Sequence, residues 1–152
     1  MHNKKYFAIL RIAAIFLVFA MLLPVGVNAA VPETVQPCAS YYLNSYNAYI
    51  YPAGNGKIQV WFTVTGVDYM DELGALRIAI YESTDNSNWT WVKTFTHDTT
   101  SGMLGYDDYF YGSNVNYQGV AGRYYKAYVC IWAGENGDGD ARYFWTSSKL
   151  AT

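Results

Sequence analysis

The sequence predicts an all-β protein, a single antiparallel β-sandwich of about seven strands. Apolar and polar residues alternate with a period of two in several stretches, as they do when successive side chains leave a strand on opposite faces. Turn residues, chiefly glycine, asparagine and aspartate, recur every eight to fifteen residues. No stretch beyond residue 30 shows the period of an amphipathic helix. Short alternating stretches and frequent turns favour a sandwich over a mixed fold.

The first 29 residues are predicted to be a signal peptide. Lys4, Lys5 and Arg11 supply the positive end, residues 12–23 are apolar, and the small residues up to Ala29 favour cleavage after that position. A retained membrane anchor is the alternative, but a run of twelve apolar residues is too short to span a hydrocarbon core of ~30 Å as a helix. We therefore expect a secreted protein with no stable membrane span after cleavage.

The 123 residues after the signal peptide are acidic overall. Three of the ten basic residues lie in the signal peptide and all twelve acidic residues follow it, so seven basic side chains face twelve acidic ones. The net charge is −5 with His97 neutral, and no cluster of lysine and arginine is present. This balance argues against nucleic acid or anionic lipid as a partner. Residues 30–38 predict an extended leader, and residues 39–152 a single domain.

The first elements of the domain are predicted from alternation and one turn. Residues 39–50 have a mixed pattern that predicts one or two short strands. Residues 53–56 predict a tight turn, because their two glycines tolerate positive φ. Residues 57–65 predict a strand. Its inward side chains are Ile58, Val60, Phe62 and Val64, and its outward ones are Lys57, Gln59, Trp61 and Thr63.

The middle of the chain predicts a loop and two further strands. Residues 66–74, with two glycines and three carboxylates, are expected to form the loop. Residues 75–82 predict a strand with Leu76, Ile78 and Ile80 inward and Arg77, Ala79 and Tyr81 outward. After a polar turn at residues 83–88, residues 89–96 predict a fourth strand. One of its faces carries Trp89, Trp91, Lys93 and Phe95 and the other little but Val92, which indicates an edge strand.

The last third contains the most regular strand. A loop at residues 97–105, a tyrosine-rich strand at residues 108–118 and a turn at residues 119–122 lead into residues 123–133, the predicted central strand. Tyr125, Ala127, Val129 and Ile131 face the core of that strand, and Tyr124, Lys126, Tyr128, Cys130 and Trp132 face outward. A loop rich in glycine and aspartate at residues 134–140 and a final strand at residues 142–148 complete the expected sheet.

Among sandwiches, a fibronectin-III-like or related topology is favoured over a true immunoglobulin domain. Tyr128 stands two residues before Cys130, as in the immunoglobulin signature, but the strand at residues 57–65 has no cysteine to face it. Gly122 followed by Tyr125 instead resembles a tyrosine corner, in which the phenol bonds back to the backbone. A jelly-roll-like sandwich is the alternative.

The two cysteines, Cys38 and Cys130, permit a single disulfide in an exported protein. An unstrained bond that closes so long a loop contributes about 3–4 kcal/mol to stability. Two separate buried thiols are the alternative, since one cysteine pair is not a disulfide framework.

Several runs resemble a family of small secreted proteins from Gram-positive, largely clostridial, bacteria whose function is not characterised. The resemblance lies in residues 54–64, 70–75, 102–104, 115–119 and 122–125. It covers nearly the whole chain after the signal peptide and implies an exported protein with one domain. It brings no catalytic or binding residues with it, so the functional argument depends on the side chains.

Catalytic patterns in the sequence are weak. His97 lies beside Asp98 on a predicted loop, without the Gly-x-Ser-x-Gly elbow of a serine hydrolase, and is expected to be a solvated loop residue. It also lacks the partners of a zinc site. Glu72, Glu82, Asp107 and Asp108 could supply the carboxylate pair of a glycosidase, but acidic turn residues are the simpler interpretation.

The loop at residues 134–140 echoes an oxygen-ligand calcium loop, with Glu135, Asp138 and Asp140 as candidate ligands. Its match to an EF-hand is poor, because the position of the bidentate glutamate falls on Ser147. A flexible hairpin loop is the simpler interpretation. No other cofactor is expected.

Aromatic content is the strongest functional signal. The chain after the signal peptide keeps fifteen tyrosines, five tryptophans and four phenylalanines. Those on the outward face of the predicted strands, and candidates for a binding platform, are Trp61, Tyr81, Tyr124, Tyr128 and Trp132. Flat rings stack on the apolar faces of sugars, and nearby polar groups bond their hydroxyls. The simpler interpretation is that these rings pair across strands for stability, at about 0.2–1 kcal/mol a pair.

The sequence therefore favours a secreted, non-enzymatic β-sandwich that binds an extracellular glycan or cell-wall polymer through an aromatic sheet face. A protein-interaction or surface-assembly module that uses the same face, as an exposed apolar patch can, is the alternative. A small secreted hydrolase is the third hypothesis.

Overall fold

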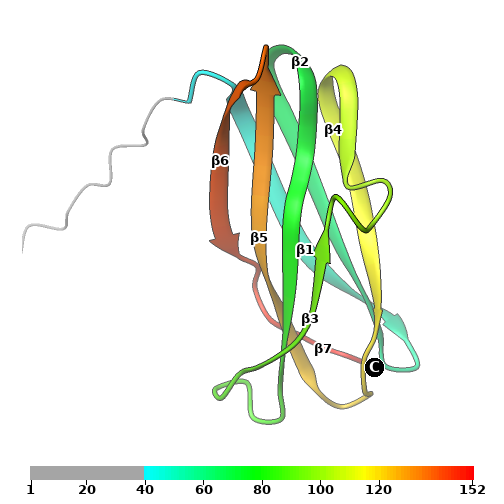
Figure 1. Ribbon diagram of the computed structural model, residues 1–152. Helices are drawn as coiled ribbons and strands as arrows, with labels where there is room; N and C mark the ends of the chain where they lie inside the picture. Colours follow the sequence, from blue (N-terminus) through cyan, green and yellow to red (C-terminus); the bar gives the residue numbers. More distant parts are fainter. Residues whose placement is uncertain (1–39) are drawn as a thin grey trace, which may run out of the picture. The chain divides into compact units, whose positions relative to one another are not determined.

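The computed structural model describes residues 40–152, which form seven antiparallel strands in one curled sheet (Figure 1). The strands are β1 (Leu43–Gly54), β2 (Lys57–Ser83), β3 (Thr90–Thr96), β4 (Leu104–Gln118), β5 (Tyr124–Glu135), β6 (Asp138–Trp145) and β7 (Lys149–Leu150). The predicted all-β class and antiparallel arrangement are confirmed. The predicted signal peptide and leader lie outside the described residues. Within residues 40–152, no helix is long and apolar enough to cross a membrane.

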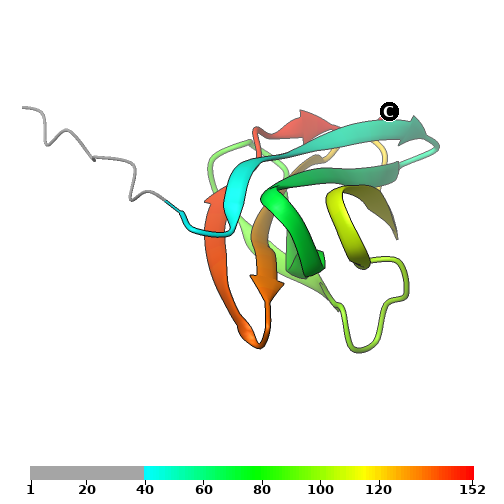
Figure 2. The same cartoon turned by 90° about the horizontal axis from the view of Figure 1, so that it is seen from above.

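Strand β2 organises the sheet because its 27 residues run through both of its halves. Residues 57–65 lie between β1 and the end of β4, whereas residues 72–83 pair with β5 on one side and with β3 and the start of β4 on the other. We call β1, residues 57–65 and residues 110–118 the β1 half. The β5 half consists of residues 72–83 of β2 together with β3, β5 and β6. Seen from above, the strands curl around a common interior (Figure 2).

The expected loop at residues 66–74 is wrong, because β2 continues through it as a bent strand. Thr65 pairs with Phe110 and Met70 with Asp108, so four residues of β2 lie opposite a single residue of β4 at the bend. Beyond the bend, Glu72 pairs with Tyr106 of β4 on one side and Gly134 of β5 on the other. Hydrogen bonding to two neighbours keeps this stretch extended despite its loop-like composition.

The core fills the space between the two halves, and the alternation in the sequence identifies most of it. All four predicted inward residues of 57–65 are fully buried, as are those of β5. Leu76 is an exception and is only half-buried. A bulge between Ala75 and Arg77 shifts the alternation by one residue, so that Ala75 is buried instead.

Strand β3 is an edge strand, as predicted, and pairs only with β2 among the described strands. The expectation that its aromatic residues share one face is wrong. Ile80 pairs with Lys93 and Tyr81 with Trp91, so a bulge at Val92 places Trp91 on the outer face of the sheet. Phe95 instead packs against the core.

The predicted tyrosine corner is confirmed. The hydroxyl group of the fully buried Tyr125 accepts a hydrogen bond of 2.8 Å from the backbone N–H of Val120. The same hydroxyl donates to the Glu82 carboxylate, which also pairs with Arg123. Burial, with the bond to Glu82, raises the pKa of Tyr125 to about 12. The corner ties the turn before β5 to the end of β2.

The expected loop at residues 134–140 is a two-residue turn instead. Asn136 and Gly137 have φ angles of 53° and 85°, and Glu135 pairs with Asp138 across them. Positive φ at both positions is the geometry of a type I′ hairpin turn, which matches the twist of the flanking strands. Strand β6 therefore begins four residues before the predicted start at residue 142 and ends at Trp145.

Candidate functional site

Four of the five predicted platform residues lie on the outer face of the β5 half. Tyr81 comes from β2, and Tyr124, Tyr128 and Trp132 come from β5. Trp61 lies elsewhere, on the outer face of the β1 half, where it pairs with Tyr49 and Asn114. The core separates this face from the outer face of the β5 half. The five residues therefore do not form one platform.

Tyr81 and Tyr128 instead join a compact cluster of rings around Trp145 of β6. The centroid of the Trp145 ring is 5.0 Å from that of Tyr81 and 4.8 Å from that of Tyr128. Tyr143 continues the cluster, since its ring stacks on Tyr128 at 5.9 Å with an interplanar angle of 28°. Edge and offset contacts of this kind stabilise each pair beyond the area that they bury.

A lysine joins one further tryptophan, Trp89, to this cluster. The ammonium nitrogen of Lys126 lies 4.4 Å from the ring centroid of Trp89 and 4.3 Å from that of Trp145. These are cation–π distances. Trp91 pairs with Tyr81 across the sheet, and its indole N–H donates to the Thr94 hydroxyl at 2.9 Å.

We call this surface the aromatic face; its rings are Tyr81, Trp89, Trp91, Tyr128, Tyr143 and Trp145. Three of them are strongly exposed, with 57% of Trp91, 55% of Tyr143 and 47% of Trp145 accessible to solvent. Their neighbours Tyr81 and Tyr128 are half-buried and support them from the side. The result is a row of solvent-facing rings across four adjacent strands.

Tyr124 and Trp132 lie toward the two ends of β5, each about 13 Å along the strand from Tyr128. The indole N–H of Trp132 donates to the Glu72 carboxylate at 2.9 Å. Its ring lies close against the backbone of the β5–β6 hairpin, where a Cβ atom added at Gly139 would be 2.4 Å from the ring. Trp132 therefore packs the β5–β6 hairpin against β2.

Cys130 is buried in the outer face of β5, beside Tyr143. Its side-chain hydrogen bond to Tyr143 is the main cause that raises the pKa of that phenol, and Arg77 nearby opposes the rise. Cys38 lies outside the described residues, so the disulfide stays a prediction.

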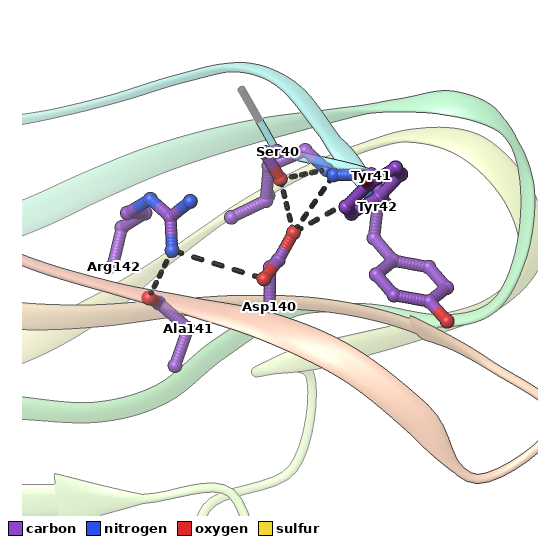
Figure 3. A network of polar contacts seen from close by, with 7 residues as sticks. Ser40, Tyr41, Tyr42, Asp140, Ala141 and Arg142 are labelled. Atoms are coloured by element: carbon purple, nitrogen blue, oxygen red, sulfur yellow. Dashed lines mark hydrogen bonds and ion pairs between the residues drawn. The ribbon is translucent and has the colours of Figure 1, made fainter. Parts of the chain in front are cut away.

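The candidate calcium ligands do not share one site. Glu135 and Asp138 flank the hairpin turn, whereas Asp140 points toward the chain that precedes β1 (Figure 3). Asp140 Oδ2 accepts hydrogen bonds from the Ser40 hydroxyl and, at 3.0 Å, from the Tyr41 N–H. The Ser40 bond holds the pKa of Asp140 below its usual value. Calcium binding by these three residues would require Asp140 to release Ser40.

Among residues 40–152, no group of three or more His, Cys, Asp or Glu side chains is placed to hold a metal ion.

The carboxylates considered for glycoside hydrolysis have other partners. Glu72 accepts the Trp132 indole, and Glu82 binds Tyr125 and Arg123. Glu72 and Glu82 lie ten positions apart on one strand, or about 33 Å. Glycosidase carboxylates lie within about 10 Å of each other, so these two cannot act as a pair.

The remaining catalytic candidates lie at a bend and in a loop. Asp107 has a positive φ of 52°, and Asp108 accepts the backbone N–H of Tyr109 at 2.7 Å, so Asp108 caps the bend of β4. His97 is exposed in the loop after β3, with its ring nitrogen 3.5 Å from Asp98.

Sequence reasoning missed the residues on β6 and β3, although one signal points to those on β6. The pair Asn136-Gly137 is a strong hairpin signal and fixes the register of β5 and β6. Counting outward from that turn places Trp145 opposite Tyr128 and Tyr143 opposite Cys130, as the structure has them. No comparable signal identifies Trp91, because the bulge at Val92 reverses its face.

Comparisons with known proteins add little. No protein family model matches the chain, and no curated protein is similar enough to match it. A family 76 glycoside hydrolase from a bovine Bacteroides thetaiotaomicron strain, known from a crystal structure, is similar over 72% of this chain, with 18% identity and a TM-score of 0.32. The similarity covers 20% of that chain, and at this TM-score it carries no argument. The clostridial resemblance therefore stays a prediction.

Proposed function

We propose that the protein is a secreted, non-enzymatic binding module that holds an extracellular glycan or cell-wall polymer against the aromatic face. The observation that supports this proposal most strongly is the set of exposed rings on β3 (Trp91) and β6 (Tyr143 and Trp145), with Tyr81 and Tyr128 on the two strands between them. They lie on a sheet rather than on loops, so their positions are set before a ligand arrives. Preorganised rings bind with little loss of side-chain entropy.

The chemistry of the aromatic face suits a sugar polymer. Sugar rings have apolar faces that stack on indole and phenol rings, and hydroxyl groups that need hydrogen-bond partners. The phenol groups of Tyr143 and Tyr81 and the ammonium group of Lys126 supply such partners beside the rings. A chain of several sugars can therefore lie across β5 and β6.

The proposal is tested by isothermal titration and by pull-down on purified bacterial cell walls and soluble polysaccharides. Trp145→Ala should weaken binding about tenfold or more, because truncating a tryptophan at the centre of an interface removes a large part of its binding energy. Trp61→Ala is the matched control, since this half-buried tryptophan lies on the other half of the sheet. If both variants bind as the wild type does, the aromatic face is not the glycan site.

A protein-interaction module is the second candidate, supported by a separate exposed aromatic pair at the bend of β2 and β4. Tyr69 and Tyr109 are 63% and 52% exposed, and their rings pack edge to face at 5.6 Å. Failure to bind any glycan, together with self-association that Tyr109→Ser abolishes, would favour this function.

A further inference from the structure

The strands that carry the aromatic face contain no acidic residue along it. Neither aspartate nor glutamate occurs in four strand segments: residues 77–81 of β2, the whole of β3, residues 124–134 of β5 and residues 141–145 of β6. All eleven acidic residues among residues 40–152 lie outside these segments. The strand segments that carry five of the six rings thus supply no carboxylate, on a protein whose chain after the signal peptide is acidic overall. The turn that carries the sixth ring, Trp89, contains Asp85, whose carboxylate accepts hydrogen bonds from Asn88.

Two cations do point outward on this face. Arg77 is exposed and pairs with Cys130, the residue opposite Tyr143, and Lys126 lies between the rings of Trp89 and Trp145. The ion pairs among residues 40–152 join His97 to Asp98, Arg123 to Glu82 and Arg142 to Asp140, and include neither of these cations. Rings attract a cation but do not neutralise it, so both charges remain available to an anionic ligand.

The spacing of the two cations favours an extended ligand. Arg77 lies four residues before Tyr81 on β2, or about 13 Å along the strand, and Lys126 pairs with Tyr81. A single small anion cannot contact both cations at once. A polymer with repeated charges can do so while a sugar ring lies over Trp145, which pairs with Tyr128 at the level of Ala79, between Arg77 and Tyr81 along the strands.

We propose that the ligand of the aromatic face is an acidic polysaccharide whose uronic-acid carboxylates bind Arg77 and Lys126. This inference rests on the proposed glycan-binding function and adds the charge of the glycan. Guanidinium groups bind carboxylates through two parallel hydrogen bonds, and a lysine ammonium offers three donors. The acidic residues elsewhere repel such a polymer, which steers it to this face.

Polygalacturonate and its fully methyl-esterified form provide the test, because they share a backbone and differ in the carboxylate charge. The full-length mature protein should bind polygalacturonate about tenfold or more tightly than the ester, as a charge-assisted hydrogen bond contributes this much. Arg77→Gln and Lys126→Gln should each remove most of this preference. Lys149→Gln, at the exposed C-terminal strand, is the matched control and should retain it.

The outcomes separate this inference from the proposed function. Equal binding of both polymers, weakened by Trp145→Ala, would overturn the acidic ligand and leave the glycan-binding face in place. Binding of a phosphate-rich wall teichoic acid but not of polygalacturonate would overturn the uronic-acid assignment. Far-UV circular dichroism and thermal melting of each variant establish that the fold is intact, and Arg77 is exposed enough for its replacement to be tolerated.

Discussion

The hydroxyl group of Tyr125 connects the turn before β5 to the end of β2, where Glu82 also pairs with Arg123. It accepts from the Val120 N–H, donates to Glu82, and lies in a fully buried position. Without this hydroxyl group the half-buried Glu82 carboxylate would keep only Arg123, and the Val120 N–H would lose its acceptor. Loss of hydrogen-bond partners is costly. Tyr125 therefore contributes to stability through polar contacts as well as through its ring.

Tyr125→Phe should lower the free energy of unfolding by about 1–3 kcal/mol, because the ring still fills the core but Glu82 loses one of its two partners and Val120 its acceptor. Urea denaturation followed by tryptophan fluorescence measures the change. Tyr117→Phe is a suitable control: Tyr117 packs edge to face on Tyr125 and is only half-buried. A stability equal to that of the wild type would contradict the role given to the hydroxyl group.

The same residue predicts a response to alkaline pH. The folded protein holds the pKa of Tyr125 at about 12, against about 10 in an unfolded chain. Below pH 10 both states are protonated and the stabilisation is complete. Between pH 10 and 12 the unfolded chain releases its proton first, so stability falls as pH rises. Tyr125→Phe should show a smaller decline of Tm across this range.

Asp140 is predicted to hold the segment before β1 against β6. Asp140→Ala should speed amide hydrogen exchange at Tyr41 and Tyr42 and leave the core amides protected, since the bonds that it loses are local. Asp138→Ala, on the same strand, is the control. Because the Ser40 bond lowers the pKa of Asp140, this stabilisation exists above the usual pKa of aspartate and disappears as pH falls through the lowered value.

At the scale of the elements, Gly74 lets β2 pass between β4 and β5. Its φ is +152°, and a Cβ atom there would lie 2.2 Å from the Met103 carbonyl oxygen, which accepts the Ala75 N–H at 2.8 Å. The Met103 carbonyl oxygen is a backbone atom, so it cannot move aside without breaking its hydrogen bond to the Ala75 N–H. The close approach explains why a glycine interrupts an otherwise apolar stretch.

Gly74→Ala should therefore destabilise the protein by about 1–3 kcal/mol or more, the usual cost of backbone strain. Gly112→Ala in β4 is the matched control, because its Cβ would have no atom closer than 3.4 Å. Thermal unfolding compares the two variants. A Tm for Gly74→Ala at or above that of Gly112→Ala would contradict the described crossing of β2.

Local alternation predicted much of the fold and failed where pairing overrides composition. The burial of β5 and of residues 57–65 follows from the pattern alone, because one face of each strand packs on the core. The passage of β2 through residues 66–74 cannot be predicted from the pattern, because the glycines and carboxylates of this stretch are typical of a loop. The stretch is extended because of its pairing with β4 and β5. The bulges at Leu76 and Val92 likewise depend on how β2 pairs with β5 and β3, and the local sequence pattern does not predict this pairing.

At the scale of the whole molecule, the same limit decides how well the candidate site could be predicted. Alternation correctly directs Trp61, Tyr81 and Tyr128 outward, but only the course of β2 shows that Trp61 belongs to the other half of the sheet. The register of the β5–β6 hairpin places Trp145 opposite Tyr128 and so adds it to the site. One half of the molecule thus has an aromatic face, and the acidic residues lie outside the strand segments that carry five of its six rings.

The five tryptophans make this arrangement directly measurable, because each gives one indole N–H signal in a two-dimensional ¹H–¹⁵N spectrum. The protein is titrated with oligosaccharides released from the cell-wall fraction that it binds. The signals of Trp91 and Trp145 should shift with added ligand, while that of Trp61 on the other half should stay unchanged. Shifts at Trp61, or confined to the amides of Tyr69 and Tyr109 at the bend, would contradict a binding site on the aromatic face.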